Sequence, residues 1–556
     1  MAVTVTENRT VLDSADALTN WNQGALDTSL YAEASASVTY AVNTSTDQLF
    51  WSGTAVNFTT AGNELIYIWT QNSAVQNAWN ASGGSASHAI WLSDGTNEII
   101  LYNAGNDRTV FQHSINQVLF QCFLIDVDYL DTKNTNGEIY AVSGSYASFD
   151  PTAITEVGAY YVTLSKALAG GTNIWCDVIR YGTGGISITG GTTGDRGNFQ
   201  EVCVEDRSTA DLKGHGIIRE YTAKTYGCQG PITIGTTSTG DTWFEDSGFS
   251  LTFEDRDVGD DKFKIILLGN VTGGEETHLY LSNGTIASAR PGVELDFSST
   301  GINTIDIDGM TFSALGGLIT FPTDSASYSH DIVNSLFDGA DAINAGATTF
   351  TGNTIISSVV AADTSALIWN VATDPDGYLD NITIAKTDGV AHHGIEFGTT
   401  SPLTINLTNP TAIGFNASDG QNDSFFHVKR TGGTVTINVT GGVGNFKYKT
   451  AGATVNVVQS VPITITVIDA DGDPIENAQT SVFLLDSPYT EIMNKDTLAS
   501  GVASGTYGGS TPEDVVVKVR KSETTDDPRY FAYSRTQVIG SGGLTLTVTL
   551  EENPFV

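Results

Sequence analysis

The sequence predicts an all-β protein with more than one domain. Its apolar residues fall in short runs, and clusters of Asn, Gly, Ser and Asp separate these runs, as turns separate strands. A single hydrophobic core seldom exceeds about 250–300 residues, and the chain has 556. We therefore expect three β domains, with boundaries at 1–248, 249–458 and 459–556.

The first expected domain, residues 1–248, contains seven of the eight tryptophans. Its runs at 65–69, 98–102 and 118–125 are apolar at successive positions, so both faces of these strands should be buried. Turn-type clusters such as 80–84 lie between the runs. This pattern predicts a two-sheet sandwich of the jelly-roll or lectin-like kind.

The second expected domain, residues 249–458, has shorter alternating runs, several of them preceded by an asparagine. The asparagines are Asn303, Asn334, Asn353 and Asn381, and strand starts recur roughly every twenty to thirty residues. That period suits one coil of a parallel β-helix, with Ile and Val inward and asparagines stacked at the corners. A further antiparallel sandwich is the alternative.

The third expected domain, residues 459–556, begins with an alternating run at 461–468 and a polar turn at 469–474. Further strands are expected at 515–519 and 544–548. This spacing is typical of a small antiparallel sandwich. It resembles the immunoglobulin-like or carboxypeptidase-regulatory-like modules of phage and bacterial surface proteins.

The charge balance is strongly acidic, with 25 Lys and Arg against 63 Asp and Glu and a formal net charge of -38. Such a chain cannot neutralise a phosphate backbone, so nucleic acid is not an expected partner. Solubility and self-repulsion account for the acidity, and divalent-cation sites are the alternative.

The four cysteines, Cys122, Cys176, Cys203 and Cys228, form no CxxC pair and suggest buried thiols made in a reducing compartment, with disulfide pairing left open. The first residues lack the features of a secretion signal, and no apolar run reaches the roughly 18 residues of a membrane helix. We expect no membrane insertion, and release by lysis if the protein acts outside a cell.

Three segments carry a resemblance to a family: 174–184 (IWCDVIRYGTG), 230–235 (GPITIG) and 242–246 (TWFED). Together with the pattern of short apolar runs and turn clusters over residues 10–270, they resemble virion structural proteins of marine tailed phages. The resemblance implies a tail fibre, tailspike or head-surface appendage, assembled in the host cytoplasm as part of the virion. It implies a homo-oligomer, with a trimer favoured, whose partners are other virion proteins and host surface polysaccharide. It assigns no catalytic residues.

Asp306 and Asp308 are the catalytic candidates. On a strand they share the outer face about 6.5–7 Å apart, a separation that suits a pair of carboxylates in glycoside hydrolysis. A solvated outer face is the favoured interpretation, because no aromatic-lined cleft can be recognised around them.

The metal candidates are Asp255, Asp257, Asp260 and Asp261, whose carboxylates could hold a structural Ca²⁺. They lack the spacing of an EF-hand loop, so a plain acidic loop is favoured and no metal or other cofactor is expected.

His392, His393 and Glu396 form the densest group of potential transition-metal ligands. On a strand His392 and Glu396 share one face, and these two ligands are too few for a site unless neighbouring coils contribute. A polar face of the β-helix is therefore favoured.

Among the aromatic residues, Trp79 lies in a turn-rich segment and is the candidate for stacking on a sugar ring. The chain has no Gly-x-Ser-x-Gly motif and no phosphate-binding loop, which argues against nucleophilic hydrolase and nucleotide chemistry. The leading hypothesis is a non-enzymatic structural virion protein that contacts host glycans or neighbouring virion proteins. A β-helical tailspike depolymerase and a capsid decoration protein are the alternatives.

Overall fold

The structure is a computed structural model of the whole chain. It describes residues 3–31, 35–41, 46–72, 89–101, 111–115, 118–162, 173–206, 215–254, 262–270, 274–289, 292–324, 328–357, 361–387, 389–485, 489–509, 512–521, 529–540 and 542–553. The chain forms two compact units. Unit 1 is Met1–His330 with Asp338–Asp341, and unit 2 is Asp331–Phe337 with Ala342–Val556.

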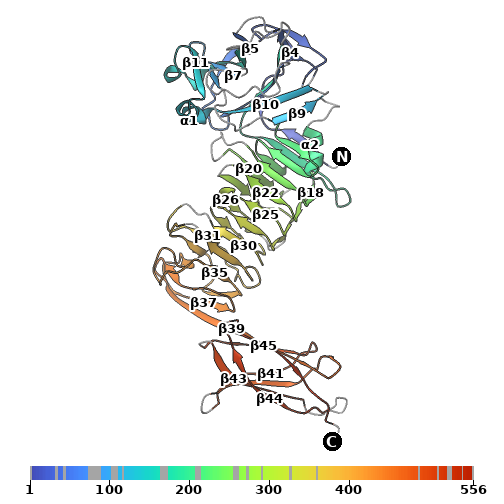
Figure 1. The fold of residues 1–556 in the computed structure, drawn as a ribbon, viewed down its shortest axis with the longest axis vertical. Coiled ribbons are helices and arrows are strands. Elements are labelled where there is room, and N and C mark those ends of the chain that lie inside the picture. The colour runs from blue at the N-terminus through green and yellow to red at the C-terminus, as the bar shows by residue number, and fades with distance from the viewer. Residues whose placement is uncertain are drawn as a thin grey trace. The chain divides into compact units, whose positions relative to one another are not determined.

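Unit 1 begins with two antiparallel sheets (Figure 1). The first contains β3 (Ala25–Asp27), β4 (Ser37–Ala41), β13 (Asn173–Tyr181), β6 (Leu65–Asn72), β10 (Val118–Asp126) and β9 (Phe111–Ile115), with β2 (Thr10–Asp13) paired to β13. The second contains β11 (Ile139–Ser143), β8 (Glu98–Leu101), β7 (Ala89–Ser93), β12 (Ile154–Val162) and β5 (Thr46–Val56). The runs expected as central strands lie in β6, β8 and β10.

The two sheets share one hydrophobic core. Leu49 and Trp51 of β5 belong to the same buried cluster as Ile66 and Ile68 of β6. On β7 every residue is buried. Ile90 and Leu92 belong to the shared core, while Trp91 on the other face packs in a second cluster between Phe50 and Tyr160, with ring centroids 5.6 Å away in each case. This explains why the strands are apolar on both faces. The jelly-roll or lectin-like topology stays a prediction.

Downstream, unit 1 continues as parallel coils. Three ladders run through them. The first ladder consists of β14 (Ile186–Gly190), β17 (Ile232–Gly235), β20 (Lys264–Leu268), β23 (Val293–Asp296) and β26 (Gly316–Thr320). The second consists of β18 (Thr242–Ser247), β21 (Thr277–Ser282) and β24 (Thr304–Asp308). The third consists of β16 (Thr225–Cys228), β19 (Ser250–Phe253), β22 (Thr285–Ser288) and β25 (Thr311–Ser313). The expected β-helix-like architecture is thus present, and parallel pairing starts upstream of residue 249. The expected domain boundaries stay predictions.

The coils are held by inward-pointing apolar residues in register. Phe244, Leu279 and Ile305 occupy matching positions on β18, β21 and β24, and all three are fully buried. Two short elements flank this region at its N-terminal end: β1 (Val3–Glu7) pairs antiparallel with β14, and β15 (Ile218–Thr222) with β16. The α-helices in the described part of the chain are α1 (Leu130–Thr135) and α2 (Phe199–Asp206). No helix there is long and apolar enough to cross a membrane.

Unit 2 repeats the parallel arrangement. Its ladders are β29 (Ile343–Asn344), β31 (Ser365–Trp369), β33 (His393–Phe397), β36 (Phe426–Val428) and β38 (Tyr448–Thr450); β30 (Thr354–Ser357), β32 (Thr383–Lys386) and β35 (Thr411–Ile413); and β34 (Thr404–Thr408), β37 (Thr434–Thr440) and β39 (Thr454–Ile468). The short strands β27 (Ser329–Val333) and β28 (Leu336–Asp338) each contain residues of both units.

Some of the asparagines named from the sequence lie at corners between strands of the coils, as expected, and others do not. Asn381 and Asn409 adopt φ of +57° and +52°, and each donates its backbone N–H to the next coil. The Asn409 side chain also donates to Asn381 Oδ1 at 3.1 Å. Asn353 instead lies fully buried, where its side chain bonds to Ser335 N and to the Ile332 carbonyl, both at 2.8 Å.

The long strand β39 takes part both in a parallel ladder of the coils and in a sheet of the C-terminal region. Its first half pairs parallel with β37, and its second half pairs with β42 (Val502–Tyr507) and β45 (Leu544–Thr549). A second sheet, β41 (Glu491–Asp496), β40 (Gln479–Leu484), β43 (Glu513–Arg520) and β44 (Tyr533–Ile539), shares a buried core with it. The expected C-terminal two-sheet arrangement is present, and its assignment as immunoglobulin-like stays a prediction.

All four cysteines are buried thiols outside any disulfide bond, as the absence of close pairs indicated. Burial raises the pKa of the Cys176 thiol to about 12, so this thiol stays protonated at neutral pH.

Candidate functional site

The outer face of β18, β21 and β24 in unit 1 carries a group of aromatic and charged side chains that could bind a ligand. Parallel register places side chains from three coils in rows: Trp243, His278 and Thr304 form one row, and Glu245, Tyr280 and Asp306 form the next. Because strand residues alternate between faces, all of these side chains lie opposite the buried row of Phe244, Leu279 and Ile305.

The first row is a rigid aromatic stack. The Trp243 and His278 rings are stacked with centroids 3.6 Å apart and planes 21° apart. His278 is held at both ring nitrogens, because Nδ1 lies 2.9 Å from Thr304 Oγ1 and Nε2 lies 3.1 Å from Glu276 Oε2. Tyr280 lies beside His278 with its ring nearly parallel.

A loop at 191–198 adds a cation to this face. The loop is attached to β18 because Gly197 N donates to the Trp243 carbonyl at 2.9 Å and Glu245 N donates to Gly197 O at 2.8 Å. A Cβ at Gly197 would lie 2.0 Å from Val3 Cγ1, so any larger residue would force the Val3 side chain or the loop to move. The attachment places the Arg196 guanidinium 4.0 Å above the Tyr280 ring, and Nη1 bonds to Glu245 Oε2 at 2.9 Å.

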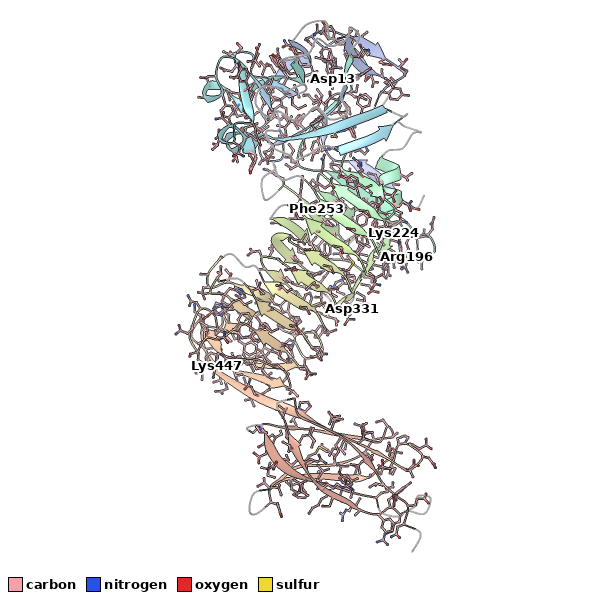
Figure 2. All side chains as sticks on the ribbon, viewed as in Figure 1. Asp13, Arg196, Lys224, Phe253, Asp331 and Lys447 are labelled. Atoms are coloured by element: carbon pink, nitrogen blue, oxygen red, sulfur yellow. The ribbon has the colours of Figure 1, made fainter. Side chains whose placement is uncertain are left out.

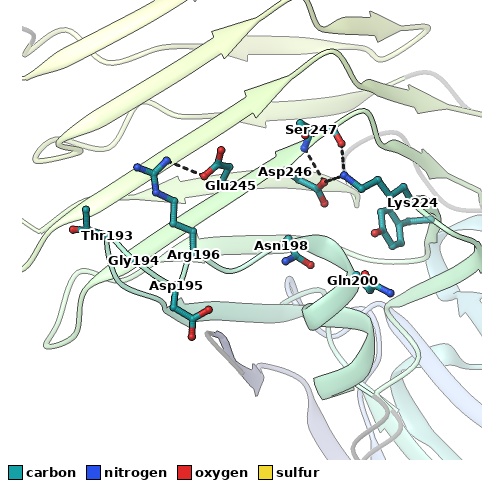
Figure 3. Close-up of a pocket in the computed structure, with 11 residues that line it drawn as sticks. Thr193, Gly194, Asp195, Arg196, Asn198, Gln200, Lys224, Glu245, Asp246 and Ser247 are labelled. Atoms are coloured by element: carbon teal, nitrogen blue, oxygen red, sulfur yellow. Dashed lines mark hydrogen bonds and ion pairs between the residues drawn. The ribbon is translucent and has the colours of Figure 1, made fainter.

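A polar cavity of about 560 Å³ opens beside this loop (Figure 3). Its lining comes from three elements, the loop, the start of α2 and the end of β18, together with two residues from the β15–β16 hairpin: Thr193, Gly194, Asp195, Arg196, Asn198, Gln200, Lys224, Tyr226, Glu245, Asp246 and Ser247. Figure 2 labels Arg196 and Lys224, which lie near each other on unit 1.

Asp246 is the buried carboxylate of this cavity, with 5% of its surface exposed. It accepts hydrogen bonds from Phe199 N at 3.1 Å and Ser247 N at 2.8 Å, so it fixes the start of α2. Lys224 Nζ lies 3.7 Å from its Oδ1. Burial raises the pKa of Asp246, and the two backbone donors and Lys224 act against this rise.

The arrangement suits a hydroxyl-rich ligand. Aromatic rings offer apolar surface to the carbon face of a sugar, while carboxylate, guanidinium and amide groups pair with hydroxyls. The cations of the cavity are already paired, Arg196 with Glu245 and Lys224 with Asp246. The cavity therefore has no surplus positive charge for an anionic ligand.

The sequence candidates lie partly in this site. Asp306 and Asp308 are exposed on the outer face of β24, and Asp306 shares a row with Glu245 and Tyr280. Their role in catalysis stays a prediction. Trp79, Asp255, Asp257, Asp260 and Asp261 lie outside the described residues, so neither the favoured acidic loop nor the alternative calcium site is tested.

The sequence pattern did not predict that Trp243, His278, Tyr280 and Arg196 lie in contact on one face. A signal was present, because each aromatic residue stands at an outward position of an alternating run. The coil register that brings them together could not be read from the sequence, since the coils differ in length.

Comparisons with known proteins add little to this geometry. No protein-family model matches the chain, and no curated protein is detectably similar to it. Among solved structures, the catalytic unit of the thermostable GH87 alpha-1,3-glucanase from Streptomyces thermodiastaticus strain HF3-3 matches with 11% sequence identity. The match covers 82% of this chain and 95% of that chain with a TM-score of 0.21, which is too low to support an argument about function.

Proposed function

We propose that this chain is a structural, polysaccharide-binding protein of a phage particle, and that the outer face of β18, β21 and β24 contacts the glycan. The observation that supports this most is the polar cavity beside the Trp243–His278 stack, where Arg196 joins the two. The placement on a phage particle is supported by the sequence resemblance at 174–184, 230–235 and 242–246.

The expected ligand is a neutral polysaccharide. The cavity is lined by three carboxylates, Asp195, Glu245 and Asp246, against two cations, Arg196 and Lys224. The chain as a whole carries a formal charge of -38, so an anionic polymer is repelled. Neutral hydroxyls can pair with the Glu245 and Asn198 side chains without adding charge.

Affinity electrophoresis through gels that contain neutral polysaccharides tests the proposal. The unaltered chain should be retarded, and Trp243→Ala and Arg196→Ala should each migrate freely. Tyr140→Ala is the matched control, because Tyr140 is an exposed aromatic residue of unit 1 far along the chain from this face. The proposal would be contradicted if no neutral polysaccharide slowed the unaltered chain. It would also be contradicted if the Trp243→Ala and Arg196→Ala variants were slowed as much as the unaltered chain.

A depolymerase is the second candidate, since Asp306 lies in one row with Tyr280 and Glu245 and Asp308 follows on the same face. Two carboxylates on one face are the minimum for glycoside hydrolysis. Release of reducing ends from a bound polysaccharide, lost in Asp306→Asn or Asp308→Asn, would establish this activity. Retardation in the gel without such release supports binding alone.

The resemblance also supports a homo-oligomer within the virion, and we propose a trimer. Light scattering of the purified chain should give three times the monomer mass, and antibodies should label intact particles. A monomeric mass at micromolar concentration would contradict the trimer, and unlabelled particles would contradict the location.

A further inference from the structure

A cluster of two histidines and one aspartate lies in unit 2. Among the residues that the structure describes, Asp363, His393 and His427 bring one potential metal-ligating atom each to within 4.8 Å of one another. They come from successive coils: Asp363 precedes β31, His393 begins β33 and His427 lies in the middle of β36. His393 is fully buried and His427 is 3% exposed.

The histidine pair expected to form a polar face therefore lies inside. His392 and His393 are both fully buried, and His392 points elsewhere: its ring packs edge-on against Phe415, with Nδ1 3.1 Å from the His393 carbonyl. His393 alone faces the cluster, and the neighbouring coils supply the other two ligands.

Both ring nitrogens of His393 face hydrogen-bond acceptors. Nδ1 lies 2.7 Å from the Ser424 carbonyl, and Nε2 lies 3.1 Å from Asp363 Oδ1. A neutral imidazole has one N–H, so it can satisfy only one of them. With the proton on Nδ1, where a backbone carbonyl fixes the tautomer, the Nε2 lone pair points at a carboxylate. A cation between Nε2 and Asp363 would resolve this conflict.

His427 lies directly beside this point, with its ring centroid 4.3 Å from that of His393. Its buried Nδ1 has no hydrogen-bond partner among the described residues, since Glu396 Oε2 lies 3.8 Å away. A nitrogen lone pair of this kind can serve as a metal ligand.

Lys449 supplies the positive charge that the cluster now has. Its ammonium bonds to Asp363 Oδ1, and also to Asn422 Oδ1 at 2.9 Å. Asp363 is 40% exposed in its side chain, so it can turn from Lys449 towards the histidines. In a tetrahedral zinc site the ligand atoms lie about 3.3 Å apart, so ligand atoms now up to 4.8 Å apart need to approach by up to about 1.5 Å.

We propose that Asp363, His393 and His427 bind a divalent transition ion of the zinc type, which replaces the Lys449 ammonium at Asp363. Two imidazoles and one carboxylate are an established ligand set for such ions. The Ser424 carbonyl orients His393, as second-shell acceptors do. A bound ion would join three successive coils and stiffen this part of the parallel region, since binding to the folded state alone stabilises it.

The test uses the full chain, stripped of metal with a chelator and dialysed against Zn²⁺ in excess Mg²⁺. One zinc ion should bind per chain, Co²⁺ should give the absorption of a tetrahedral site, and zinc should raise the melting temperature. His427→Gln and Asp363→Asn should each weaken zinc binding more than about tenfold. Asp363 is partly exposed, so its variant remains informative if the buried histidine variants fail to fold.

Two further variants separate a metal site from a purely structural contact. His392→Gln is the matched control: it removes an adjacent buried histidine that faces away, and zinc affinity should not change. Lys449→Met removes the competing cation and should strengthen zinc binding by about tenfold or more, a gain that no structural role predicts. Absence of stoichiometric zinc in the unaltered chain, or binding that is unaffected by Asp363→Asn and Lys449→Met, would overturn the proposal.

Discussion

The Trp243 indole and the His278 imidazole are stacked on neighbouring coils with ring centroids 3.6 Å apart. This contact joins two parts of the chain that pair only because β18 and β21 are in parallel register. Since His278 is held at both nitrogens, its ring is a fixed support for the indole, and the aromatic surface beside the cavity is ordered before any ligand arrives.

His278→Ala should therefore weaken polysaccharide binding although His278 itself is 8% exposed and offers little surface to a ligand. Trp243 would lose the ring on which it rests, and an aromatic pair contributes about 0.5–1.5 kcal/mol beyond its buried area. Affinity electrophoresis and the tryptophan emission spectrum measure the two effects. His278→Phe keeps the ring without its hydrogen bonds and should retain most binding; equal loss in both variants would show that stacking is not the cause.

The inward row of the parallel coils should dominate stability. Ile307 of β24 is fully buried and stacks on Leu281, so Ile307→Ala should cost about 2–5 kcal/mol and Ile307→Val about 0.5–1.5 kcal/mol. Chemical denaturation followed by circular dichroism measures the change in the transition of the parallel region. Similar losses for the two variants would indicate that β24 is not packed as described.

Glu7 links the first strand to the rest of unit 1. It accepts hydrogen bonds from Arg9 at 2.7 Å, and Arg180 Nε and His215 Nδ1 lie 3.4 and 3.0 Å from Oε2. Burial alone would raise the pKa of Glu7, but the charge and hydrogen bonds of Arg9, with contributions from His215 and Arg180, hold it well below its usual range. Glu7→Gln should cost about 3 kcal/mol or more, because the buried Arg9 guanidinium loses its counter-charge.

The loss in Glu7→Gln should depend on pH. The pKa of Glu7 is lower in the folded than in the unfolded state, where it is about 4.3, so the carboxylate stabilises the fold fully above about pH 5. This contribution declines as the pH falls further towards the folded pKa. Melting temperatures of the two proteins should therefore differ most near neutral pH and converge in acid. A constant difference from pH 7 to pH 3 would contradict this account.

Asn409 tests the asparagine corners. Its φ of +52° is left-handed, a conformation that costs an ordinary residue about 1–2 kcal/mol and costs glycine nothing. Asn409→Ala should lower the free energy of unfolding by about that amount plus the lost hydrogen bond to Asn381. Asn409→Gly, measured in the same denaturation experiment, should lose less; the reverse order would show that the corner is not left-handed.

Much of the fold follows from local pattern. The strands at 65–69 and 118–125, the turn clusters between them and the alternating run at 304–308 all follow from the spacing of apolar residues, because alternation and turn propensity act over a few residues. The outward position of Asp306 and Asp308 follows in the same way from the two-residue period of a strand.

The sequence by itself thus determined an all-β chain, the approximate strands and the coiled, parallel character of its middle part. Only the tertiary structure decided which outward and inward residues meet. It brought Trp243 onto His278, and it brought His393 to Asp363 and His427 when the sequence pattern pointed to His392. The reason is that coils of unequal length set the register, so partners some thirty residues apart share no local pattern that could reveal them.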